Sequence, residues 1–169
     1  VLVEFRQRMG QALRMAMAWG LIFVGIIAGY GLWSDIRHDI LPMQELAADG
    51  SVEVPRAEDG HYYLTLTING TAVPFMVDTG ATGMVLAGVD ADRLGIDPES
   101  LSYLGEASTA NGVVRTARVT LPTVELGPFR NQDFRAYVTE GALDQSLLGM
   151  DYLGQFRMEF SGGKLILRQ

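Results

Sequence analysis

The stretch Val73-Pro74-Phe75-Met76-Val77-Asp78-Thr79-Gly80-Ala81 is the most informative part of this 169-residue chain. An apolar run that ends in Asp, Thr and Gly predicts a strand that leaves a core and places a carboxylate at a tight turn, where its ionisation can be tuned. This Asp-Thr-Gly tripeptide occurs once. Because water activation by paired carboxylates needs two of them, the single copy predicts that a second subunit supplies the other.

The surrounding sequence predicts an all-β domain. Residues Tyr63–Ile68 alternate apolar and polar side chains, and Asn69-Gly70 is a dipeptide favoured in two-residue type I′ hairpin turns. A hairpin therefore delivers Asp78. Further strands are predicted at 84–86, 102–108, 113–121, 123–126, 134–138, 156–160 and 164–167, with one helical turn at 90–94. The chain lacks the long helices that parallel crossovers need, so we expect a small closed β-barrel over 59–169.

The N-terminal part has a different character. Residues 15–33 contain no charged side chain, which predicts a transmembrane helix over 15–34. Three arginines in the preceding segment, 1–14, favour a cytoplasmic N-terminus. A cleaved signal peptide is the alternative, although its apolar region is usually shorter. Residues 35–58 are acidic and irregular and are predicted to be a linker with one short helix around 43–48.

Composition excludes several classes of function. The chain has a formal net charge of −7 and no cysteine, so disulfides are excluded. Residues 35–169 carry 10 basic and 19 acidic side chains, and such a surface would repel nucleic acid. The two histidines, His38 and His61, lack the spacing of a zinc site. We therefore expect no nucleic-acid partner, no metal and no cofactor.

Two later motifs complete a pattern with the Asp78 stretch. Ala110-Asn111-Gly112 is a candidate hairpin tip, and the apolar pair Leu147-Leu148 precedes Gly149. Together with Asp-Thr-Gly-Ala, they resemble the retropepsin-like aspartic proteases, in particular the single-pass, membrane-anchored bacterial branch. The resemblance covers roughly residues 60–168. It implies a homodimeric aspartic endopeptidase in the bacterial inner membrane, with the protease domain in the periplasm and a protein or peptide as substrate.

The resemblance also implies a role for each motif. Asp78 would be the catalytic carboxylate, Thr79 would hydrogen-bond across the dimer axis, and Gly80 would let the turn close. Ala81 completes the active loop. It stands where two-lobed relatives commonly carry Ser or Thr, and this difference predicts a mildly acidic pH optimum. A flap over the substrate would be formed by Ala110, Asn111 and Gly112, and structural support for the active loop by Leu147, Leu148 and Gly149.

Other interpretations of these motifs remain open. Asp78 could be a structural turn residue, and Asn111-Gly112 an ordinary surface turn. The domain could grip an extended segment without cutting it, as a peptide-binding or scaffolding module. Met150 stands where viral relatives usually carry Arg, which leaves the dimer geometry open. Gly25 and Gly29 could instead support self-association of the N-terminal helix.

Overall fold

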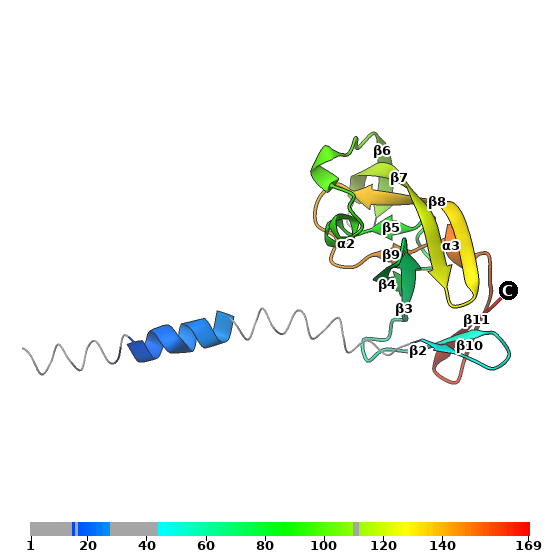
Figure 1. The fold of residues 1–169 in the computed structure, drawn as a ribbon, viewed down its shortest axis with the longest axis horizontal. Coiled ribbons are helices and arrows are strands. Elements are labelled where there is room, and N and C mark those ends of the chain that lie inside the picture. The colour runs from blue at the N-terminus through cyan, green and yellow to red at the C-terminus, as the bar shows by residue number, and fades with distance from the viewer. Residues whose placement is uncertain (1–14, 16, 28–43, 110–111) are drawn as a thin grey trace, which may run out of the picture. The chain divides into compact units, whose positions relative to one another are not determined.

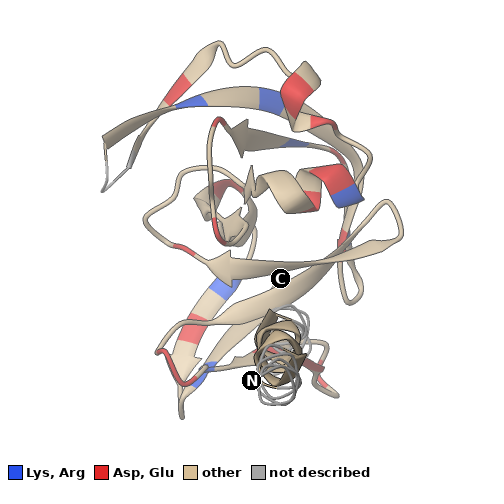
Figure 2. Cartoon of the chain, turned by 90° about the vertical axis from the view of Figure 1, so that its left-hand side faces the viewer, with Lys and Arg blue, Asp and Glu red and all other residues tan. Residues whose placement is uncertain are grey.

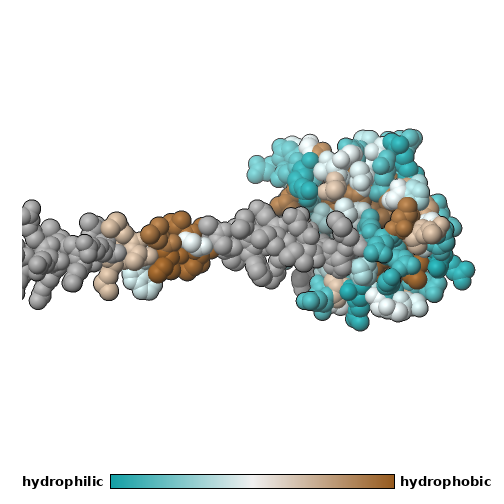
Figure 3. All heavy atoms as spheres, turned by 60° about the horizontal axis from the view of Figure 1, so that its bottom comes forward, coloured by the Kyte–Doolittle hydropathy of each residue, from teal (hydrophilic) through white to brown (hydrophobic). Residues whose placement is uncertain are grey.

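The computed structural model describes residues 15, 17–27, 44–109 and 112–169. The chain divides into two units, Val1–Leu41 and Pro42–Gln169. In the first unit, the described residues are helical and exposed, and Figure 3 shows most of them as hydrophobic. Of the flanking segments, 1–14 and 28–43 lie outside the described residues.

The predicted membrane span is contradicted. Among the described residues, no helix is long and apolar enough to cross a membrane. The prediction of a transmembrane helix at 15–34 is therefore wrong, and so is the inner-membrane location that was inferred from it. Gly29, one of the two glycines considered for helix self-association, lies outside the described residues.

The second unit consists mainly of strands (Figure 1), and the prediction of an all-β domain is confirmed. One sheet has the strand order β3-β4-β9-β5-β8-β7-β6, with β3 also paired to β7, and the other has the order β1-β2-β11-β10. The strands thus divide between two sheets, whereas the sequence predicted one closed barrel. The elements are β1 (Glu45–Leu46), β2 (Val52–Pro55), β3 (Tyr63–Ile68), β4 (Thr71–Val77), β5 (Val85–Leu86), α2 (Gly88–Arg93), the 3-10 helix η1 (Pro98–Ser100), β6 (Gly105–Thr109), β7 (Gly112–Leu126), β8 (Phe129–Thr139), β9 (Leu147–Leu148), α3 (Met150–Leu153), β10 (Arg157–Ser161) and β11 (Lys164–Arg168).

The hairpin that leads to Asp78 forms as predicted. Strands β3 and β4 pair antiparallel, with Ile68 opposite Thr71. Asn69 and Gly70 between them have φ angles of 49° and 82°, which a type I′ turn requires. The alternating apolar residues of both strands enter the core, and Leu66, Ile68 and Phe75 are fully buried there. This burial fixes the register of the strand that carries the active loop.

The segment before the hairpin differs from the predicted linker. Residues 44–58 contain β1 and β2, and no helix is described at 44–48. Strand β2 pairs antiparallel with the C-terminal strand β11, so that Val54 lies opposite Leu165. Val52 and Val54 are buried, whereas the residues between and after them are half-buried. The alternation Val-Glu-Val-Pro is short, but it matches the two-residue period of a strand with one face in a core.

Candidate active site

Asp78 follows β4 directly and begins the loop that leads to β5. Its backbone N–H donates to the carbonyl oxygen of Leu148 at 3.1 Å, and its own carbonyl accepts the N–H of Ala81 at 3.2 Å. The carboxylate oxygen Oδ1 accepts the N–H of Gly80 at 2.9 Å. A Cβ at Gly80 would lie 3.2 Å from the same oxygen, which is a tight contact. The loop therefore closes around a half-buried carboxylate.

Strand β9 lies between the two strands that flank this loop. It pairs parallel with β4, where Met76 is opposite Leu147, and antiparallel with β5. After β9 the chain continues along the loop: the N–H of Met150 donates to Ala81, and the N–H of Asp151 donates to Thr82, both at 2.9 Å. The Leu147-Leu148-Gly149 motif therefore runs alongside the loop that begins at Asp78.

Gly149 makes the closest approach in this arrangement. A Cβ at this position would lie 2.4 Å from the carbonyl oxygen of Gly83 and 2.8 Å from that of Ala81. Both neighbours are backbone atoms, which cannot rotate away as a flexible side chain can. Only glycine leaves room for the two segments to pack against each other at this point.

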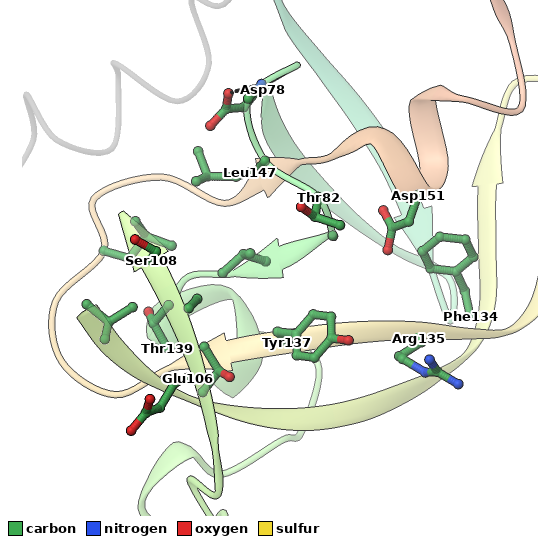
Figure 4. Close-up of a pocket in the computed structure, with 18 residues that line it drawn as sticks. Asp78, Thr82, Glu106, Ser108, Phe134, Arg135, Tyr137, Thr139, Leu147 and Asp151 are labelled. Carbon is green, nitrogen blue, oxygen red and sulfur yellow. Dashed lines mark hydrogen bonds between the residues drawn. The ribbon is translucent and has the colours of Figure 1, made fainter. Parts of the chain in front are cut away.

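Asp78 opens onto a cavity of about 980 Å³. Its walls come from the active loop, the β6–β7 hairpin, strand β8 and the segment around β9 (Figure 4). The lining residues are Asp78, Gly80, Ala81, Thr82, Gly83, Val85, Glu106, Ala107, Ser108, Val114, Thr116, Phe134, Arg135, Tyr137, Thr139, Leu143, Leu147 and Asp151.

The predicted site residues are distributed unevenly around this cavity. Asp78, Gly80, Ala81 and Leu147 line it, whereas Thr79 is exposed outside it. Leu148 and Gly149 are buried behind the loop. Of the predicted flap tip, Gly112 begins β7, and Ala110 and Asn111 lie outside the described residues. Both arms of the β6–β7 hairpin, which the tip joins, contribute to the cavity wall.

Several residues that line the cavity were not predicted from the sequence. Arg135, Tyr137 and Thr139 alternate along β8 and face the cavity together, a period-2 signal that was present in the sequence. Asp151 lies two residues after Gly149, and its Oδ2 accepts the N–H of Met84 at 3.2 Å. Burial raises the pKa of the Asp151 carboxyl above its ordinary value, against the opposing effect of that hydrogen bond.

The charges around the site are mostly negative. Acidic and basic residues are interspersed along the chain of the second unit (Figure 2). The cavity itself is lined by three carboxylates, those of Asp78, Glu106 and Asp151, and by one guanidinium, that of Arg135. Among the described residues, no group of three or more His, Cys, Asp or Glu side chains is arranged to hold a metal ion.

Comparisons with known proteins agree with this architecture. The family model described as "gag-polyprotein putative aspartyl protease" matches residues 64–155. An uncharacterized protein in the cobV 5′ region of a Sinorhizobium species is 30% identical, over 93% of this chain and 73% of that protein. The uncharacterized protein RP867 of Rickettsia prowazekii (strain Madrid E) is 34% identical, over 82% of this chain and 63% of that protein.

A solved structure extends the likeness to the fold. The crystal structure of a retropepsin-like aspartic protease from Rickettsia conorii superposes with a TM-score of 0.64 and 38% sequence identity, covering 70% of this chain and 89% of that one. The family model spans more than half of the residues, including the active loop and the Leu-Leu-Gly segment behind it. The chain therefore belongs to the retropepsin-like aspartic protease family.

Proposed function

We propose that this protein is an aspartic endopeptidase that hydrolyses peptide bonds of protein substrates with water activated between the Asp78 carboxylates of two protomers. The observation that carries the proposal is the Asp78 carboxylate itself, held by the Gly80 N–H at the end of β4 and open to a cavity of about 980 Å³. A cavity of this size can accommodate several side chains of an extended peptide. Family membership supports the same activity.

The need for a homodimer follows from the chemistry. Two carboxylates that share one water molecule cannot both be ionised, so one acts as base while the other keeps a proton. The base takes a proton from the water as its oxygen attacks the peptide carbonyl carbon, and the protonated partner donates to the carbonyl oxygen. As the tetrahedral intermediate collapses and the C–N bond breaks, the first carboxyl gives the proton it took from water to the leaving nitrogen, and a hydroxyl of the intermediate returns a proton to the second carboxyl. The sequence has one Asp-Thr-Gly, so the second carboxylate comes from a second copy.

The remaining predicted residues take supporting roles in this proposal. Thr79, exposed beside Asp78, would hydrogen-bond across the dimer axis to its counterpart. The β6–β7 hairpin, whose tip includes Ala110, Asn111 and Gly112, would close over the bound peptide and pair with its backbone. The Leu147-Leu148-Gly149 segment would hold the active loop in position without touching the substrate's reacting atoms. The proposed protease domain comprises 59–169.

The test is cleavage of a diverse pool of quenched fluorescent peptides by the full chain. Asp78→Asn removes the base while keeping the size of the side chain, and we expect a loss of about 10²–10⁴-fold or more in kcat/KM. Asp92→Asn is the matched control, because Asp92 is exposed on α2 and lies outside the cavity lining. Equal cleavage by wild type and Asp78→Asn would refute the proposal that the protein is an aspartic peptidase. Peptide binding without cleavage by either would instead favour a peptide-binding module.

A further inference from the structure

The Asp151 side chain is fixed at the cavity wall by contacts with the active loop. Its backbone N–H donates to Thr82 at 2.9 Å, and its Oδ2 accepts the Met84 N–H at 3.2 Å. The backbone N–H of Tyr152 also interacts with this carboxylate. Among the described residues, no basic side chain makes an ion pair with it. Asp151 is exposed and lines the cavity, so its carboxylate can be reached by a ligand.

Gly83 is the reason why this carboxylate reaches the cavity. A Cβ on Gly83 would lie 2.9 Å from Cε2 of Tyr137 and 3.4 Å from Oδ2 of Asp151. The Tyr137 ring and the Asp151 carboxyl group thus occupy the space that a side chain at position 83 would need. Because position 83 has no side chain, both groups form part of the wall, and all three residues line the cavity.

The neighbours of Asp151 suit the stem of a long cationic side chain. Figure 4 shows its carboxylate directed toward the space bounded by Thr82, Phe134 and Tyr137. The aromatic rings of Phe134 and Tyr137 offer apolar and π surfaces to a methylene chain and its charged end. The other charged groups of the cavity are Asp78, Glu106 and Arg135. With Asp151 included, carboxylates outnumber basic groups three to one.

We propose that Asp151 is a specificity-determining residue that binds a basic side chain, Lys or Arg, of the substrate peptide. The inference rests on the proposed peptidase function and names the substrate class of the same site. The Asp151 carboxylate accepts the ammonium or guanidinium hydrogen bonds through Oδ1, while Met84 continues to hold Oδ2. The basic residue occupies a position away from the scissile bond, because Asp78 and Asp151 lie in different parts of the cavity wall (Figure 4).

The experiment measures the ratio of kcat/KM for Lys over its uncharged isostere norleucine at each position of a cleaved peptide, with full-chain protein. Because the ratio is taken within each variant, a general loss of activity cancels. In wild type we expect a ratio of about tenfold at one position, as one charge-assisted contact in a partly desolvated site provides. Asp151→Asn brings this ratio close to one, and Asp151→Lys brings it below one, because the new charge repels Lys. Asp92→Asn keeps the wild-type ratio.

The outcomes separate the two proposals. Cleavage by wild type with the same Lys preference in Asp151→Asn overturns the role of Asp151 and leaves the peptidase standing. If wild type cleaves nothing, the peptidase fails, and the inference is then decided by fluorescence anisotropy with the same labelled peptides. In that case tighter binding of Lys than norleucine peptides, abolished by Asp151→Asn, supports the basic subsite, whereas equal binding overturns it.

Discussion

Gly149 shows how one residue type can fix the geometry of an active loop. The atoms that exclude a side chain there are the carbonyl oxygens of Gly83 and Ala81 and the carbonyl carbon of Gly83. They belong to the loop that begins at Asp78, so a shift that relieved the clash would move the loop itself. The position of the carboxylate thus depends on a hydrogen atom at position 149.

We expect Gly149→Ala to lower the free energy of unfolding by about 3 kcal/mol or more, since overpacking against backbone exceeds the ordinary cost of an added methyl group. Urea unfolding followed by circular dichroism measures the change. Gly88→Ala is the matched control, because the nearest atom to its Cβ would be 3.9 Å away. It should alter stability by less than about 1 kcal/mol. Equal effects of the two substitutions would contradict the close approach.

Asp151 should reduce stability when it is ionised. Its pKa is raised in the folded protein, mainly by desolvation, so the folded state binds the proton more tightly than the unfolded state. The wild type accordingly loses stability as the pH rises from the unfolded value, about 3.9, through the folded one. Asparagine keeps the acceptor for the Met84 N–H and removes the titration.

The melting temperature of Asp151→Asn relative to wild type should therefore be higher at pH 7 than at pH 3. Differential scanning fluorimetry across this range measures the difference, with Asp92→Asn as the control for loss of one negative charge from an acidic protein. A relative stability of Asp151→Asn that falls between pH 3 and pH 7 would contradict the raised pKa.

Local patterns predicted the elements whose determinants lie within a few residues. The β3–β4 hairpin was predicted because alternation and the Asn69-Gly70 turn are both local. The predictions at 113–121 and 123–126 fell short because β7 runs without a break through Pro122 to Leu126. Long pairing with β8 over ten residue pairs holds this strand together, and such pairing is not visible in a short window.

Strand β2 was missed for a related reason. Its partner β11 lies more than a hundred residues away along the sequence, and an acidic segment with two prolines gives a weak local signal. The same limit applies to the cavity. Asp78 and the Leu-Leu-Gly segment were predicted because motifs mark them, whereas Glu106, Tyr137 and Asp151 converge only through the tertiary fold.

The assignment of 44–58 to a paired segment can be tested by substitution. Val54 is fully buried opposite Leu165, so Val54→Ala should lower the free energy of unfolding by about 2 kcal/mol through lost burial and a residual cavity. Glu58→Ala, at an exposed position of the same segment, should change it by less than about 0.5 kcal/mol. Urea unfolding of both variants decides the matter, because a true linker would tolerate the two substitutions equally well.

The protein as a whole has one Asp-Thr-Gly loop per chain but two carboxylates at its cavity wall near the active loop, those of Asp78 and Asp151. A catalytic pair could in principle form within one chain or between two copies. Asp151 is held by the Met84 N–H and has no hydrogen bond to Asp78 among the described residues. Our proposal requires a symmetric pair of Asp78 carboxylates from two copies. This arrangement predicts a defined loss of activity in mixed dimers.

Wild type and Asp78→Asn refolded together from denaturant in equal amounts should form mixed dimers. If subunits pair at random, about a quarter of the dimers carry two Asp78 carboxylates, so the activity per wild-type subunit falls to about half of its value alone. Native mass spectrometry confirms the mixed species, and the peptide assay measures the activity. Activity per wild-type subunit that stays constant would mean that each chain works alone, as an intrachain pair of Asp78 with Asp151 would. A fall to half distinguishes these cases, because an inactive subunit abolishes the activity of its wild-type partner only if the two share one active site.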